Sequence, residues 1–185
     1  MRTTKHILWT EMTRLVSEMK ADGNRLHLLI TIQSMLGLRI GDVLSLRWKD
    51  FDGEHLTIKE QKTSKDRRVI LNDSLRNAVQ SEFKFAFKKN DLIFVNKLGA
   101  GSIGIGYVNR QLKKAFKKYE IEADQVSSHI FRKSFAMKVL EDNDYSDKGM
   151  FLVMRLLNHT SLNTTLRYLL LDKQEESNAY LNLTI

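Results

Sequence analysis

The 185-residue chain contains neither cysteine nor proline. Without cysteine, the protein cannot form disulfide bonds, thiolate zinc sites or a cysteine nucleophile. No apolar run approaches the roughly 18 residues of a membrane-spanning helix, and residues 1–6 are polar and basic, unlike a secretory signal. We therefore expect a cytoplasmic protein with no membrane partner. The lack of proline has no physical explanation that we can offer.

Charge is unevenly distributed along the chain. Thirty Lys and Arg residues exceed 22 Asp and Glu residues, and residues 84–118 alone contain nine basic residues and one acid. Concentrated positive charge favours a polyanionic partner, above all nucleic acid, because bound Lys and Arg release counterions from phosphates. A solvated helix face is the simpler alternative. The DNA-binding candidates of this segment are Lys113, Lys114, Lys117 and Lys118.

The remaining composition is that of one folded domain, which we place over residues 1–185. Hydrophobic residues make up 42% of the chain, which is enough for a core. Their periodicity predicts a mainly α protein with one small antiparallel β-sheet (α+β). The helices are expected over 7–20, 25–36, 41–48, 107–119, 128–140, 150–157 and 163–171, with one more after the capping residues 72–74 whose apolar stripe reaches Phe87.

Three further segments complete this prediction. The helix over 25–36 is apolar on most sides and should be central and buried. Strands over 56–59 and 68–71 flank a polar, basic hairpin, in which Lys65 and Arg67 are further DNA-binding candidates. Residues 141–149 are expected to form an acidic loop. A calcium site there is rejected, because the glycine and glutamate positions of a calcium loop do not match.

Six side chains are candidates for chemistry: Arg39, Lys62, His129, Arg132, His159 and Tyr168. Arg39 stands at a break between two buried helices, where a permanent charge needs a paired anion, either Asp42 or a ligand phosphate. His129 and Arg132 are three residues apart and share one helix face. Each feature also has an ordinary explanation, as a turn arginine, a hairpin lysine, a capping histidine or a core tyrosine.

Together these side chains describe a phosphate site without a metal. Two arginines offer paired donors to phosphate oxygens and to the charge of a transition state. Histidines and a lysine can move protons, and a phenolic hydroxyl can attack phosphorus. We expect no metal and no cofactor.

The order and local context of these residues resemble the tyrosine recombinase (phage integrase) family. The family order Arg, Lys, His-x-x-Arg, His, Tyr is present, including the nine-residue step from His159 to Tyr168. The resemblance extends over about residues 7–170. It departs at Asn158, where glycine is usual, at Lys133, where a second histidine is common, and at Ile70, often a proline. Asparagine tolerates the left-handed backbone that a glycine would serve.

The resemblance implies a site-specific DNA recombinase or integrase with the fold of DNA breaking-rejoining catalytic domains. Tyr168 would attack the scissile phosphate, leaving a 3′-phosphotyrosyl link and a free 5′-hydroxyl. Arg39 and Arg132 would clamp the phosphate, and Lys62 would protonate the leaving oxygen. Neither ATP nor metal is implied, because the ester to tyrosine keeps the energy of the broken bond.

The resemblance assigns supporting roles to other residues. His129 would assist proton transfer at the tyrosine, His159 would hydrogen-bond the phosphate, and Asp42 would support the site. The partner is double-stranded DNA, on which a homotetramer is expected, with a monomer in free solution as an alternative. The tail over 172–185 would dock on a neighbouring protomer. The N-terminal DNA-clamping domain of typical members is not expected in this chain.

Two other functions use the same residues. A type IB topoisomerase-like enzyme would relax DNA by the same chemistry without exchanging strands. A non-catalytic DNA-binding relative would have lost activity, and the complete set of six side chains argues against it.

Overall fold

A computed structural model describes residues 5–59, 66–84, 88–99, 101–169 and 181. Its elements are α1 (Trp9–Ala21), α2 (Leu26–Leu36), α3 (Ile40–Leu44), the 3-10 helix η1 (Trp48–Phe51), β1 (His55–Lys59), β2 (Asp66–Ile70), α4 (Asp73–Glu82), α5 (Ile105–Lys118), α6 (His129–Glu141), α7 (Asp147–Leu156) and α8 (Leu162–Leu169). The predicted mainly α fold with one small antiparallel sheet is confirmed. Among the described helices, none is long and apolar enough to cross a membrane.

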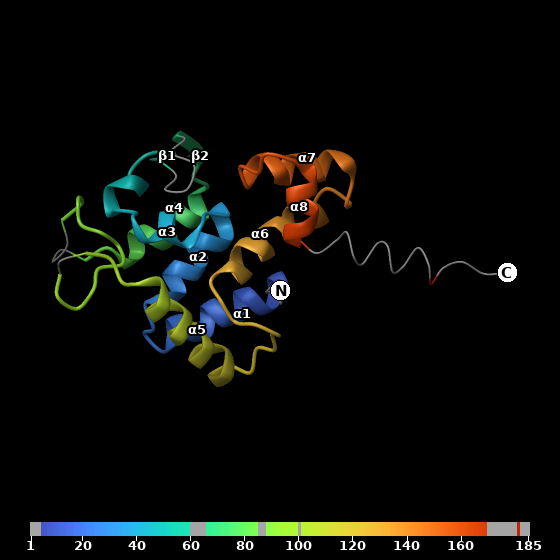
Figure 1. Cartoon of the computed structure of the whole chain (residues 1–185). Coiled ribbons are helices and arrows are strands. Elements are labelled where there is room, and N and C mark those ends of the chain that lie inside the picture. Colours follow the sequence, from blue (N-terminus) through green and yellow to red (C-terminus); the bar gives the residue numbers. More distant parts are fainter. Residues whose placement is uncertain (1–4, 60–65, 85–87, 100, 170–180, 182–185) are drawn as a thin grey trace.

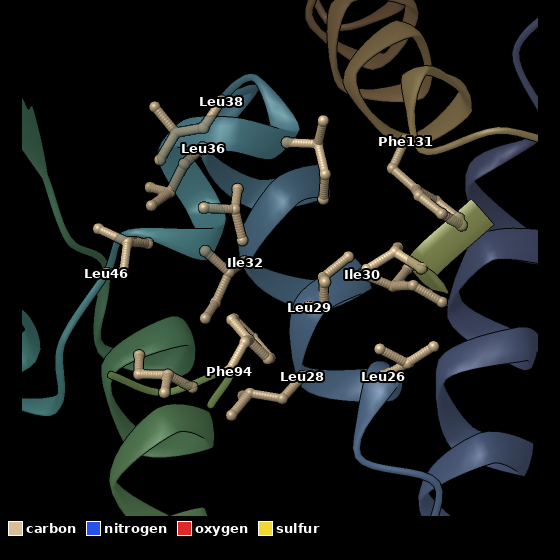
Figure 2. Close-up of a cluster of buried hydrophobic side chains, with 14 of the residues drawn as sticks. Leu26, Leu28, Leu29, Ile30, Ile32, Leu36, Leu38, Leu46, Phe94 and Phe131 are labelled. Carbon is tan, nitrogen blue, oxygen red and sulfur yellow. The ribbon is translucent and has the colours of Figure 1, made fainter. Parts of the chain in front are cut away.

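Helix α2 lies at the centre of the main hydrophobic core. Nine of its eleven residues are buried. Figure 2 shows its leucines and isoleucines packed with Phe131 of α6 on one side and with Leu46 and Phe94 on the other. Burial contributes about 1.5–3 kcal/mol for each large apolar side chain. The prediction of a central helix over 25–36 is therefore confirmed.

Helix α6 connects the main core to a second, smaller hydrophobic cluster. Its first turn contributes Phe131 to the main core, whereas Ala136 and Leu140 pack in the second cluster with side chains of α7 and α8. Arg132 and Lys133, both buried, therefore lie where the two clusters meet. This position brings the polar residues of α6 close to the ends of α2 and α7.

The β-hairpin and α7 lie at the same end of the molecule (Figure 1). Strand β1 pairs antiparallel with β2 in the register Leu56↔Val69 and Lys59↔Asp66. The buried side chains of β1 alternate with exposed ones, as the pleat of a one-sided sheet requires. The predicted site residues Lys62 and Lys65 lie outside the described residues.

The prediction of one helix over 41–48 is wrong. Helix α3 ends at Leu44, and the next helical segment is the separate 3-10 helix η1, which begins at Trp48. The backbone between α3 and η1 pairs with a segment that is distant in the chain. The Ile93 amide donates to the Leu46 carbonyl at 3.0 Å, and Arg47 forms an isolated antiparallel β-bridge with Leu92. Tertiary pairing has overridden helical periodicity here.

Two predicted boundaries also differ. Helix α4 ends at Glu82, because Phe83 adopts an extended backbone and packs edge-on against Trp48, with ring centroids 5.4 Å apart. Phe87 lies outside the described residues. The loop predicted over 141–149 is shorter, since the Ser146 hydroxyl caps α7 by accepting a hydrogen bond from the Gly149 amide at 3.2 Å.

Candidate active site

The turn that presents Arg39 depends on Gly37. Helix α2 ends there in a left-handed backbone with φ +59°, and a Cβ on this residue would lie 2.3 Å from a ring carbon of Phe135. Only glycine meets both conditions. The chain then extends through Arg39, the half-buried residue that precedes α3, and Asp42 is buried in the first turn of that helix.

Arg132 connects three segments of the fold. Its guanidinium is buried, with the residue 2% exposed. One terminal nitrogen donates to the Gly37 carbonyl after α2, and the other donates to the Leu157 carbonyl after α7 at 2.7 Å. These bonds hold the guanidinium in one orientation, because its fork of donors is rigid.

Helix α7 ends in a Schellman motif that places His159. Asn158 adopts a left-handed backbone with φ +53°, a conformation that asparagine tolerates. The Asn158 amide donates to the Arg155 carbonyl at 3.0 Å, and the His159 amide donates to the Met154 carbonyl at 2.9 Å. Both bonds satisfy carbonyls at the end of the helix.

Substitutions at Asn158 test this local requirement. Asn158→Gly keeps the left-handed backbone, and we expect its free energy of unfolding to stay within about 0.5 kcal/mol of the parent. Asn158→Val forces a β-branched residue into the left-handed backbone region, and we expect its free energy of unfolding to fall by about 1–2 kcal/mol. Urea denaturation of the two variants measures the difference, and equal stability would show that the motif is not under this constraint.

His159 and Tyr168 lie against each other. Their ring centroids are 5.3 Å apart in an edge-to-face arrangement. The Nδ1 atom of His159 is 3.0 Å from the hydroxyl oxygen of Thr165, a fully buried residue one turn before Tyr168 on α8. Sequence reasoning missed Thr165, whose only signal is its three-residue spacing from the tyrosine. Thr165 orients the imidazole at its Nδ1 side.

Two arginines act on the Tyr168 phenol. Burial raises the pKa of Tyr168 to about 12, and the positive charges of Arg132 and then Arg39 oppose this rise because they favour the phenolate. The hydroxyl is buried and has no hydrogen bond of standard geometry among the described residues, but the Arg132 side chain lies close enough to act on it as a donor. The fold therefore gathers Arg39, Arg132, His159 and Tyr168, which are scattered between residues 39 and 168, around one phenol.

A family model described as the phage integrase family matches residues 5–175. The chain belongs to this family. The probable integrase/recombinase YoeC of Bacillus subtilis is 29% identical over 144 residues, covering 77% of this chain and 76% of that protein. Tyrosine recombinase XerH of Helicobacter pylori is 30% identical over 157 residues, which cover 81% of this chain but 42% of XerH.

Solved structures of the family share the fold. The XerA recombinase superposes with a TM-score of 0.74 at 22% identity, covering 100% of this chain and 68% of that one. A XerH structure bound to its difH substrate before cleavage gives 0.71 at 26% identity, covering 97% and 55%. The chain thus spans about half the length of XerH. The predicted family, fold and recombinase class are confirmed, and the topoisomerase alternative is not favoured.

The other predicted site residues among the described ones differ in their exposure and contacts. His129 is exposed at the start of α6, one turn before Arg132. Arg67 is half-buried and donates to the Leu36 carbonyl at 2.9 Å, so its guanidinium lies against the end of α2. The basic residues predicted on α5 are exposed, namely Lys113, Lys114, Lys117 and Lys118. In the described ranges, no cluster of three or more His, Asp or Glu residues is arranged to hold a metal.

A cleft of about 580 Å³ opens between β2 and α7, beside the end of α7 that carries His159. Figure 1 shows these two elements facing each other. Asp66 to Ile70 line one wall, and Leu152, Arg155, Leu156 and Asn158 line the other. Arginines on both walls give the cleft a positive character that suits a phosphate chain.

Proposed function

We propose that this chain is the catalytic domain of a site-specific recombinase that cleaves and rejoins double-stranded DNA through a covalent bond to Tyr168. The observation that carries the proposal is the convergence of Arg132, Arg39 and His159 on the phenol of Tyr168. A tyrosine packed only for stability has no need of two guanidinium groups whose charges act on its hydroxyl.

In the proposed cleavage step, the Tyr168 oxygen bonds to phosphorus as the bond to the 5′ oxygen breaks. The phenolic proton leaves with the assistance of His129, and Lys62 donates a proton to the departing 5′ oxygen. The products are a 3′-phosphotyrosyl ester and a free 5′-hydroxyl. Rejoining is the reverse attack by a 5′-hydroxyl, which needs no external energy source.

The phosphate is held by the remaining residues. Arg39 and Arg132 donate to its non-bridging oxygens and stabilise the charge of the transition state. A guanidinium has five N–H donors, so Arg132 can hold the carbonyls of Gly37 and Leu157 and a phosphate together. A protonated His159 donates at Nδ1 to Thr165 and at Nε2 to the phosphate, and buried Asp42 supports the site.

Double-stranded DNA is the proposed partner. The family members XerH and lambda integrase were solved bound to their DNA sites. In this chain, the exposed lysines of α5 and the arginine-lined cleft supply positive charge for the DNA backbone, together with Lys65 and Arg67 of the hairpin. Action on DNA agrees with the expected cytoplasmic residence.

Covalent trapping tests the proposal. The protein is incubated with a supercoiled plasmid that carries the DNA flanking its own gene, and the reaction is stopped with SDS. We expect a protein–DNA adduct whose 3′ end is blocked and whose 5′ end accepts label from a kinase without phosphatase treatment. Recombinant products distinguish a recombinase from an enzyme that only changes supercoiling. DNA binding without any adduct would contradict the proposal.

We further propose that the protein assembles as a tetramer on paired DNA sites through the tail over 172–185, of which the structure describes only Leu181. A chain truncated after residue 172 should still bind one DNA site but should lose pairing of two sites. Analytical ultracentrifugation of the DNA complexes measures this, and unchanged pairing would contradict a role for the tail.

A further inference from the structure

Lys133 occupies an unusual position beside the proposed nucleophile. It follows Arg132 on α6 and is only 4% exposed. Its Nζ atom lies 4.9 Å from the centroid of the Tyr168 ring. Within the described residues, this ammonium has neither a hydrogen-bond partner nor a carboxylate in salt-bridge range.

Stability does not account for a lysine at this place. A buried charge without an anion costs free energy, which an apolar side chain of similar length would not. Burial lowers the pKa of Lys133, and the charge of Lys133 adds to burial in lowering the pKa of His6 in the segment packed on α6. Among the described residues, the groups shown to interact with the Lys133 ammonium are thus His6 and the Tyr168 ring.

We propose that Lys133 is a positioning residue of the cleavage step, whose ammonium holds the Tyr168 ring and stabilises the negative charge that develops on the phenol oxygen. This inference rests on the proposed role of Tyr168 as the nucleophile. An ammonium within about 6 Å of a ring centroid attracts the π face. That attraction grows when the phenol loses its proton, so the interaction is stronger in the charged state than in the resting state.

The charged groups around Tyr168 support this division of roles. Arg132 and Arg39 approach the phenol and are the proposed ligands of the phosphate. The imidazole of His159 lies at the ring edge and is bonded to Thr165. The Lys133 ammonium lies over the Tyr168 ring itself, and thus against the ring of the proposed nucleophile.

Two substitutions separate an electrostatic role from a structural one. Lys133→Met keeps the length of the side chain and removes the charge, whereas Lys133→Arg keeps the charge. Because the folded state disfavours the charged form of Lys133, its positive charge reduces stability at every pH below its lowered pKa. We therefore expect Lys133→Met to unfold at the same temperature as the parent or at a higher one, although the variant cleaves DNA more slowly.

The effect on the phenol is measured without DNA. A fluorinated tyrosine, whose phenol is more acidic, is incorporated at position 168 and titrated by ¹⁹F NMR. We expect Lys133→Met to raise the pKa of this phenol by about one unit, which lowers the phenolate fraction about tenfold, and Lys133→Arg to restore most of it. In single-turnover cleavage, the rise of the rate with pH should move to higher pH by the same amount while the Kd for DNA is unchanged.

Lys138→Met is the matched control, since Lys138 lies on the same helix but pairs with Asp142 at the surface. It should leave both the phenol pKa and the cleavage rate unchanged. An unchanged phenol pKa in Lys133→Met, or a marked loss of thermal stability, would overturn the inference. The titration needs no DNA, so its result is independent of adduct formation. An unchanged phenol pKa together with a parental adduct would refute the role of Lys133 alone, whereas a shifted phenol pKa without any adduct would refute the proposed function alone.

Discussion

Tyr168→Phe is expected to abolish the covalent protein–DNA adduct. The substitution removes only the attacking oxygen, and removal of a nucleophile costs about 10⁴–10⁶-fold in rate in enzymes that react through a covalent intermediate. The ring keeps its contacts with His159 and Lys133. Single-turnover cleavage of labelled DNA, followed on denaturing gels, measures the loss.

The stability of Tyr168→Phe distinguishes a catalytic hydroxyl from a structural one. The Tyr168 hydroxyl is buried without a hydrogen bond of standard geometry, and its polar neighbour Arg132 keeps its own bonds to the Gly37 and Leu157 carbonyls when the hydroxyl is removed. Removing such a group leaves no partner unsatisfied, so the free energy of unfolding should not fall. Tyr145→Phe is the control, since Tyr145 is exposed in the turn between α6 and α7; this variant should cleave DNA normally. An adduct formed by Tyr168→Phe would refute the assignment.

Arg132→Ala is expected to have the second-largest effect, because it damages both chemistry and fold. Loss of one donor to a developing oxyanion typically costs about 10²–10³-fold in rate. The variant also leaves the buried carbonyls of Gly37 and Leu157 without the guanidinium that bonds them, at a cost of about 2–4 kcal/mol in unfolding free energy. Urea denaturation and adduct formation measure the two losses separately.

Arg132→Lys separates these contributions. A lysine keeps the positive charge but has a single nitrogen, which cannot reproduce the rigid fork to two carbonyls. We expect partial recovery of stability and little recovery of cleavage. Arg76→Ala serves as control, since Arg76 pairs at the surface with Asp73; such pairs contribute about 0–1 kcal/mol. If Arg132→Lys cleaved at the parental rate, charge alone would explain the role of Arg132.

Several local features could be predicted from the sequence. The helix over 25–36 follows from apolar residues on most sides, and Asn72 indeed caps α4 by accepting a hydrogen bond from the Leu75 amide at 2.8 Å. Asn158 in the place of a glycine is compatible with the left-handed backbone that it adopts. These features depend on side chains within a few residues of each other, which is why periodicity and capping rules find them.

Other features could not be predicted in this way. Helix α3 ends early because residues 46–48 pair with residues 91–93, which are distant in the chain. The contact between the Thr165 hydroxyl and the His159 imidazole does not belong to any sequence motif that would predict it. Lys133 was noted only as a departure from the family pattern, and its burial beside Tyr168 depends on how α6 and α8 pack.

The sequence by itself determined the kinds of chemical group, their order and the local turns that carry them. It also determined the family, because the order of arginine, histidine and tyrosine residues is preserved in the chain. Only the tertiary structure decided which of these groups meet: it joined Arg132 to the ends of α2 and α7 and buried Tyr168 beside Lys133. The physical reason is that local structure follows from short-range sterics and periodicity, whereas contacts between distant segments follow from the packing of the two hydrophobic clusters between which α6 lies.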